Sequence, residues 1–464
     1  MTDRLNPLDV SFLYLESPTT AMHVGGVCVF ASPDDGFDYD RLVELICQRI
    51  SLVPRYRQKV KWVPGRLANP VWVDDAEFDV SYHVRRSALP RPGDDTQLRE
   101  LVGRLQSRQL DRNRPLWEIY LVEGLEHDRV AVITKTHHAM VDGVTAVDIG
   151  TVILDVSPTP REIQPDDWHP AGEPGAVRLM VTALTDLVAK PSQAVDTARS
   201  SIGDVRATLG KSASMAGGIL ASARTVARSA PDSPLNVAIG EQRRFGMAAT
   251  ELDDYKRVRK AHGGTVNDVV LATVTGALRS WLLTRGEQVC RATTVRAMVP
   301  VSVRADARKG EMGNRVSSYF VDLPVGEASP VVRLQQVSFA MRGHKDSGAA
   351  VGADALVQLS GFAPPTIHAL GARLASSFTR RLFNLVVTNV PGPQFPLYAA
   401  GARMLSMYPV VPLAKGQAVS VGLTSYDGGV FYGLNADRDA MPDIDVMASC
   451  IEESLAELVG TASR

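Results

Sequence analysis

The chain has 464 residues, enough for two or three domains, and its composition, 45% hydrophobic and 22% charged, is that of a globular protein. A net charge of −1 argues against a dedicated nucleic-acid-binding protein, which normally carries a strong basic excess. The four cysteines, Cys28, Cys47, Cys290 and Cys450, lack the spacing of a disulfide framework or a zinc site. We expect them to be buried, small hydrophobic residues in a reducing compartment.

The N-terminal residues contain no apolar stretch of the kind found in a secretory signal peptide. No uninterrupted apolar run approaches the roughly 20 residues that a membrane-spanning helix needs. We therefore expect a cytoplasmic protein whose contact with a membrane is peripheral.

The first part of the chain alternates between strand and helix signals. Strands are predicted over His23–Phe30 and Arg129–Thr136, with another opening at Pro115-Leu116-Trp117. Helices are predicted over Asp40–Ile50 and Thr96–Gln109, where apolar residues recur at helical spacing. These elements form an expected N-terminal domain of residues 1–156.

Residues 157–234 differ in composition from the preceding chain. Ser157–Pro174 is rich in proline and acidic residues, which is typical of a linker. An amphipathic helix is predicted from Val177, and between Arg178 and Arg228 the chain has seven basic and three acidic residues. A basic amphipathic helix can lie on an anionic membrane surface. An arm that packs one domain on another is the alternative interpretation, and we favour it.

The second half is expected to be a C-terminal domain of residues 235–464. Helices are predicted over 267–283, 331–345 and 444–459, strands over 295–303 and 315–323, and an antiparallel hairpin over 419–434. Because both halves mix strands and helices, the predicted fold class is α/β (α+β) with two domains of similar size.

The most specific motif is His137-His138-Ala-Met-Val-Asp142-Gly143, at a turn between a predicted strand and a predicted helix. The unperturbed pKa of histidine, about 6.5, lets it accept and return a proton around neutral pH. Asp142 can hold the turn by hydrogen bonds, and Gly143 permits a backbone conformation denied to other residues. Because a thioester is already activated, one base that deprotonates an alcohol, with donors for the oxyanion, suffices for acyl transfer.

Adjacent histidines on a strand point to opposite sides, so we expect one to face the reaction and the other to be structural. A pair of histidines can also bind a metal. Apart from Asp142, however, no histidine, cysteine or carboxylate cluster lies nearby at ligand spacing. We therefore predict no metal site.

Further motifs accompany the histidines in a characteristic order. They are Leu5-Asn-Pro-Leu-Asp9, Met22-His-Val-Gly25, Pro115-Leu116-Trp117, Ser233-Pro-Leu-Asn236, Gly240 with Arg243-Arg-Phe245, Asn267-Asp268 and Asn389-Val-Pro-Gly-Pro393. With these motifs the sequence resembles the bacterial wax ester synthase/diacylglycerol acyltransferase family, of the actinobacterial triacylglycerol-synthase type, which carries HHxxxDG. The resemblance covers essentially the whole chain.

The resemblance implies two domains like chloramphenicol acetyltransferase, with mixed sheets flanked by helices, a helical crossover arm and a substrate tunnel between the domains. His138 would be the general base in direct transfer from a long-chain acyl-CoA, with His137, Asp142 and Gly143 shaping the site. Diacylglycerol is the implied acceptor and a long-chain alcohol, giving wax esters, a second one. No cofactor is implied, since acyl-CoA is a substrate. Such apolar substrates imply attachment to the inner face of the plasma membrane or to lipid droplets.

Substrate-binding roles for Pro115-Leu116-Trp117, Asn267 and Asp268 follow only from the resemblance. The simpler interpretation of the first motif is a strand start with a core tryptophan. Asn267 is also suited to cap its helix, as is Thr265. Pro391-Gly392-Pro393 predicts a rigid turn.

Other functions stay open. A serine hydrolase needs a Gly-x-Ser-x-Gly turn, and the nearest sequence, around Ser420, alternates like a hairpin strand. A peptide-synthetase condensation domain, or an acyltransferase that works with a polyketide carrier protein, shares HHxxxDG, but the late Asp-Phe-Gly-Trp-Gly motif of condensation domains is absent. A lipid-binding or lipid-droplet protein with little or no turnover is the alternative outside the enzymes.

Overall fold

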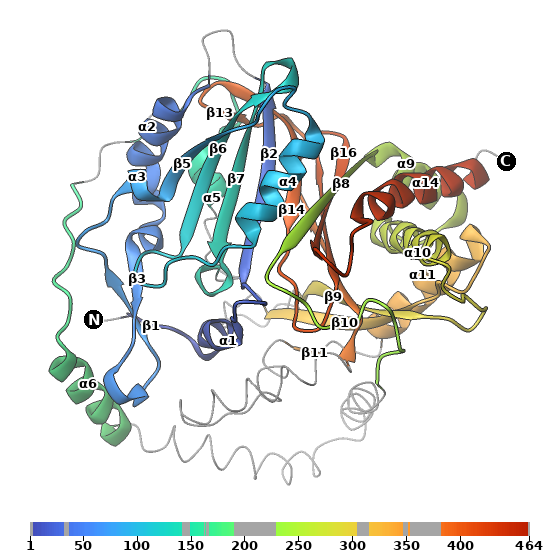
Figure 1. The fold of residues 1–464 in the computed structure, drawn as a ribbon. Helices are drawn as coiled ribbons and strands as arrows, with labels where there is room; N and C mark the ends of the chain where they lie inside the picture. Colours follow the sequence, from blue (N-terminus) through green and yellow to red (C-terminus); the bar gives the residue numbers. More distant parts are fainter. Residues whose placement is uncertain are drawn as a thin grey trace.

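Apolar residues at strand and helix spacing organise the chain around two mixed β-sheets, which lie side by side in the computed structural model (Figure 1). The structure describes residues 3–31, 37–141, 149–161, 163, 167–189, 229–303, 315–346, 351–352 and 382–462. The predicted α/β class with mixed sheets and flanking helices is confirmed.

The first half of the chain supplies most of a six-stranded sheet and all of a small three-stranded one. The strands are β1 (Asp3–Arg4), β2 (His23–Ala31), β3 (Gln58–Lys61), β4 (Val71–Asp74), β5 (Val84–Ala88), β6 (Trp117–Leu125) and β7 (Arg129–His137). The larger sheet has the order β13-β14-β2-β7-β6-β5, and the smaller one β1-β4-β3.

The helices of the first half include short 3-10 turns at several strand ends. They are α1 (Pro7–Leu15), α2 (Tyr39–Arg49), η1 (Ile50–Leu52), η2 (Pro54–Arg57), η3 (Pro64–Arg66), α3 (Val80–His83), α4 (Asp95–Gln106), η4 (Glu126–Asp128), η5 (His138–Met140), α5 (Ile149–Ile153) and α6 (Ala176–Ala189). The predicted helices over 40–50 and 96–109 correspond to α2 and α4.

The second half forms a seven-stranded sheet of order β11-β10-β9-β12-β15-β16-β8. Its strands are β8 (Arg243–Glu251), β9 (Val295–Val303), β10 (Arg315–Leu323), β11 (Val351–Gly352), β12 (Leu385–Pro391), β15 (Val419–Tyr426) and β16 (Gly429–Asp437). The helices α9 (Leu252–His262), α10 (Val266–Thr284), α11 (Pro330–Asp346) and α14 (Ile444–Ala462) gather on one side of it (Figure 1).

One segment of the second half crosses to the first sheet. Strands β13 (Tyr398–Ala399) and β14 (Ala402–Val410) follow β12 in sequence, yet β14 pairs antiparallel with β2. Gly433 of β16 allows the crossing, since a Cβ there would lie 2.0 Å from the carbonyl oxygen of Pro409. Strands from both halves of the chain therefore share the six-stranded sheet. The predicted domain boundaries stay a prediction.

Helix α4 packs on one face of the six-stranded sheet and against β8 of the other half. A Cβ on Gly103 would lie 2.7 Å from the carbonyl oxygen of Arg243, so glycine permits the close approach of this helix to β8. The opposite face of the sheet carries a second core, to which α1, α2 and α5 contribute. The candidate site lies at the edge of this sheet where β7 ends.

Two expectations need correction, and one open choice is decided. Cys28 and Cys450 are buried as expected, but Cys47 and Cys290 are exposed because they lie on the solvent side of α2 and in the turn after α10. Of the two residues suited to cap α10, Thr265 is the N-cap, and its hydroxyl accepts from the backbone N–H of Asp268. Pro391, predicted to open the turn Pro391-Gly392-Pro393, is instead the last residue of strand β12.

Candidate active site

The two motif histidines lie where β7 passes into the 3-10 turn η5. His137 is the last strand residue and faces His23 across the β2–β7 ladder. The backbone N–H of His138 donates to the carbonyl of Met22 at 2.8 Å. The two strands approach closely at Gly25, where a Cβ would lie 2.0 Å from the carbonyl oxygen of Thr134. Glycine in Met22-His-Val-Gly25 therefore lets β2 support the histidine turn.

The imidazole of His138 stacks on the ring of Phe12 from α1, with ring centroids 4.0 Å apart. Its Nδ1 is shielded from solvent and has no hydrogen-bond partner among the described residues. Burial lowers the pKa of His138 to about 4, with the nearby His137 adding to the effect. The ring is therefore neutral at physiological pH, the state in which histidine accepts a proton.

His137 is fully buried. Its Nδ1 accepts the backbone N–H of Ala139 at 3.0 Å. An imidazole nitrogen that accepts a hydrogen bond carries no proton, so the neutral ring has its proton on Nε2. The bond to Ala139 closes the turn around His138, and His137 is thereby a structural partner of its neighbour.

A buried charged cluster adjoins His137, and sequence reasoning missed it. The Glu16 carboxylate, at the end of α1, lies 3.2 Å from Nε2 of His23 and 3.6 Å from Nε2 of His137. Arg112 donates to Glu16 Oε2 from Nε at 2.9 Å. The motif Met22-His-Val-Gly25 was a sequence signal for one member, His23, but nothing in the local pattern assigns it a partner.

The remaining residues of HHxxxDG, Asp142 and Gly143, lie outside the described residues. The helix expected after them is seen in its later part as α5, whose Ile149, Val152 and Ile153 are buried.

Pro115-Leu116-Trp117 is buried beneath the histidine turn. The carbonyl of Leu116 accepts the backbone N–H of His137 at 2.9 Å. The Trp117 indole N–H donates to the carbonyl of Tyr56 at 2.8 Å, and its ring stacks on His83 with centroids 4.5 Å apart. These contacts are those of a core support for the site, while a contact with substrate stays a prediction.

Asn267 and Asp268 lie at the N-terminus of α10, in the second half. Asp268 is buried and forms a capping box with Thr265, accepting its backbone N–H at 2.8 Å. Asn267 Oδ1 accepts from the side-chain amide of Asn389 at 3.1 Å. Two motifs far apart in sequence therefore meet in one hydrogen bond.

Comparison with known proteins agrees with these motifs. The family described as the wax ester synthase/diacylglycerol acyltransferase catalytic domain matches residues 5–270, and its C-terminal domain matches residues 312–459. The chain belongs to this family. It is thus an acyltransferase, and the resemblance inferred from the motifs is confirmed.

Relatives of this acyltransferase match over most or all of its length. The probable diacylglycerol O-acyltransferase tgs1 of Mycobacterium tuberculosis is 34% identical over 466 residues, covering 100% of this chain and 97% of its own. The probable diacylglycerol O-acyltransferase tgs3 of the same organism is 46% identical over 260 residues, covering 56% of this chain and 96% of its own.

Solved structures share the fold of this family member. The wax ester synthase/diacylglycerol acyltransferase from Marinobacter aquaeolei has a TM-score of 0.71 and 31% identity, covering 99% of this chain and 100% of that one. The first condensation domain of the calcium-dependent antibiotic synthetase has a TM-score of 0.61 at 17% identity, covering 100% and 96%, and shows a likeness of fold alone.

Two further observations concern Ser420 and possible metal ligands in this acyltransferase. Ser420 lies in strand β15, as expected, and its hydroxyl donates to the carbonyl of Val411 at 2.7 Å. In the described part of the chain, no group of three histidine, cysteine or acidic residues is arranged to hold a metal ion.

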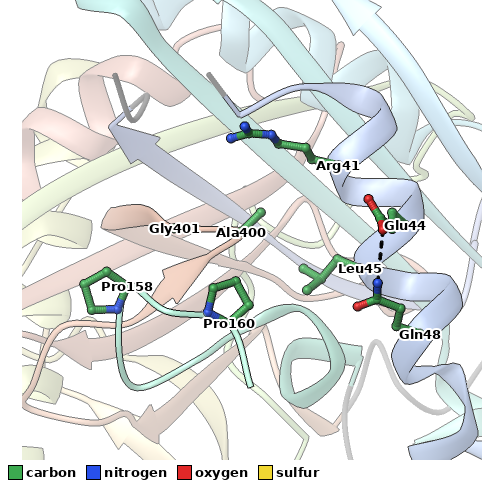
Figure 2. Close-up of a pocket in the computed structure, with 8 residues that line it drawn as sticks. All are labelled: Arg41, Glu44, Leu45, Gln48, Pro158, Pro160, Ala400 and Gly401. Carbon is green, nitrogen blue, oxygen red and sulfur yellow. Dashed lines mark hydrogen bonds between the residues drawn. The ribbon is translucent and has the colours of Figure 1, made fainter. Parts of the chain in front are cut away.

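A surface pocket lies between α2 and two turns (Figure 2). It is lined by Arg41, Glu44, Leu45 and Gln48 of α2, by Pro158 and Pro160, and by Ala400 and Gly401. The predicted site residues are not among them, so the pocket is not part of the candidate active site of this acyltransferase.

Proposed function

We propose that His138 is the general base of a direct acyl transfer from a long-chain acyl-CoA to the hydroxyl of a lipid alcohol. The observation that carries the proposal is the neutral imidazole of His138, whose Nδ1 is shielded from solvent, on a turn held by backbone bonds to Met22 and to the His137 side chain. A neutral base in an apolar setting can take a proton without first losing one.

The step balances without a further reactant. His138 takes the hydroxyl proton as the alcohol oxygen forms a bond to the thioester carbonyl carbon. The tetrahedral intermediate collapses, the carbon–sulfur bond breaks, and the protonated imidazole returns its proton to the coenzyme A thiolate. The reaction requires no resident metal or prosthetic group, and acyl-CoA enters as a substrate.

Diacylglycerol is the proposed acceptor, with triacylglycerol as product. Relatives that match the whole chain are named as diacylglycerol O-acyltransferases, which supports this choice. The 31% identical Marinobacter protein is named for both wax ester synthesis and diacylglycerol acylation, so a long-chain alcohol is proposed as the second acceptor.

The other motif residues are proposed to shape the site. His137, Asp142 and Gly143 would hold the turn, and Pro115-Leu116-Trp117 would form its floor, as the bond from His137 to Leu116 supports. Asn267 and Asp268 are proposed to contribute from the second half, where a tunnel between the domains would admit both substrates.

Peripheral attachment to a membrane or lipid droplet is proposed to involve α6. Leu179 and Ala183 of this helix are buried against the small sheet, whereas Val177 and Val181, one turn apart, are 70% and 53% exposed. Exposed apolar residues on a helix at one end of the molecule suit contact with a lipid surface (Figure 1). The rest of the expected arm, residues 190–228, lies outside the described residues. None of the helices that the structure describes has the length and apolar character of a membrane span.

The function is tested by turnover of radiolabelled palmitoyl-CoA with purified protein, offered diacylglycerol and hexadecanol separately, alongside His138→Ala. We expect triacylglycerol as the main product and a loss in the variant of about 10²- to 10⁴-fold, the usual contribution of a general base. Turnover that survives in the variant would exclude His138 as the base. Absence of product from both acceptors would favour a carrier-linked acyltransferase or a lipid-binding role.

A further inference from the structure

Helix α1 contacts both histidines of the motif through residues four positions apart. Phe12 stacks on His138, and Glu16, which caps the helix, approaches His137. Residues at this spacing lie on the same side of a helix. One short helix, capped at its start by Asn6, therefore lies against the imidazoles of His137 and His138 together.

The Glu16 side chain is only 1% exposed, yet its carboxylate is ionised. Burial alone would raise the pKa of Glu16, but contacts with His137 and His23 outweigh it and hold the pKa well below its usual range. Arg112 contributes a further charged partner and also donates to the carbonyl of Leu13, which ties it to the end of α1. A buried carboxylate with this set of partners has a fixed position.

The tautomer of His137 directs its proton toward this carboxylate. Since Nδ1 accepts from Ala139, Nε2 carries the proton, and Nε2 lies 3.6 Å from Glu16 Oε2. The Nε2 atom of His137 is buried and forms no hydrogen bond with any described residue. A buried donor without a partner is unfavourable, so the carboxylate is the group that favours this ring orientation.

We propose that Glu16 is a positioning residue for the acyl transfer. Its carboxylate attracts the Nε2 proton of His137, which keeps Nδ1 aimed at the backbone N–H of Ala139 and so holds the turn that carries His138. Glu16 itself touches no reacting atom. The inference rests on the proposed function, because it gives His138 the role of base.

The test replaces Glu16 by glutamine, which keeps its shape and removes its charge. Glu118→Gln is the matched control, because Glu118 is another buried glutamate of the same sheet region but pairs with Lys135 and Tyr120. We expect Glu16→Gln to lower kcat about 10- to 100-fold, as loss of a partner that orients a working histidine does, with KM for palmitoyl-CoA within about threefold. A kcat within about threefold of wild type would overturn the proposal.

A double-mutant cycle shows whether Glu16 acts through His137. Asparagine in place of His137 keeps an acceptor for the backbone N–H of Ala139, but its side chain is too short to reach the Glu16 carboxylate. In the His137→Asn background we expect Glu16→Gln to cause less than about a twofold further loss, because the contact is already gone. An undiminished further loss would overturn the proposal, since Glu16 would then act by another route.

The tautomer gives a test that does not need a folded Glu16 variant. Nitrogen-15 histidine spectra of the wild-type protein and His137→Asn identify the His137 ring. We expect an unprotonated Nδ1 and a protonated Nε2, and the opposite tautomer would overturn the proposal. His138→Ala, measured alongside, separates a failure of the proposed function from a failure of the inference on Glu16. If His138→Ala remains active, the proposed function fails. If only Glu16→Gln remains active, the inference on Glu16 alone fails.

Discussion

Two buried glutamates adjoin the α4 side of the six-stranded sheet, and they differ in their partners. Glu118 lies on β6 with Tyr120 at 2.7 Å, Arg85 at 3.1 Å and the buried Lys135 at 3.8 Å. Glu16 reaches the same side from the loop after α1, and its neighbours are two histidines and Arg112. The first cluster joins ordinary structural charges, whereas the second includes a residue of the HHxxxDG motif. The two clusters thus differ in their partners, and only the second contacts a residue of the motif.

The largest effect expected is on stability, at the structural cluster. Glu118→Gln leaves Lys135 without its carboxylate, and breaking a buried pair costs about 3 kcal/mol. Burial lowers the pKa of Lys135 to about 8, whereas the charge of Glu118 acts in the opposite direction and favours the protonated amine. We expect urea unfolding to show this loss while kcat stays within about threefold of wild type. A fall in kcat as large as that of Glu16→Gln would remove the distinction between the clusters.

A second pair of variants separates the two nitrogens of His137. His137→Gln can still place an amide near Glu16 but loses the acceptor for Ala139, whereas His137→Asn does the reverse. Because the Ala139 bond closes the turn, we expect glutamine to lower kcat by about 100-fold and asparagine by about tenfold. Steady-state kinetics with palmitoyl-CoA and diacylglycerol measure both. The opposite order would show that the Glu16 contact matters more than the turn.

A smaller effect is expected in the pH dependence of stability. Burial lowers the pKa of both His23 and His138 to about 4, from 6.5. The unfolded chain therefore binds more protons than the folded one between pH 6.5 and 4, so stability is full above 6.5 and falls as the pH falls. Each histidine contributes a slope of up to about 1.4 kcal/mol per pH unit. Urea unfolding at pH 7.5, 6 and 5 should give a shallower dependence for His23→Gln, and an unchanged slope would contradict the account.

The sequence predicted those features that depend on local patterns. Strands over 295–303 and 315–323 coincide with β9 and β10, because alternating apolar residues reveal a strand directly. The histidine turn was likewise predicted from HHxxxDG, and its neighbours Pro115-Leu116-Trp117 were interpreted as a strand start with a core tryptophan, which the burial of Trp117 agrees with.

Contacts between distant parts of the chain could not be predicted in this way. The crossing of β14 to pair with β2, and the approach of Glu16 to His137, join residues that no local spacing relates. The sequence led to no prediction for Glu16, since no local pattern around it assigns the carboxylate a partner. Because no sequence pattern relates these distant residues, the charged cluster around Glu16 was not predicted.

The most direct test of the central claim, that His138 is a neutral base with a lowered pKa, is the dependence of kcat/KM on pH. This ratio reports the pKa of the free enzyme's essential base. Since protonation of His138 abolishes its function and its pKa is about 4, we expect kcat/KM to stay level from pH 8 to about 5 and to fall only below that. His23→Gln, whose replaced histidine has a similar pKa, should leave the profile unchanged. A fall centred near pH 6.5 would contradict the account, because an ordinary, solvated histidine would then control the reaction.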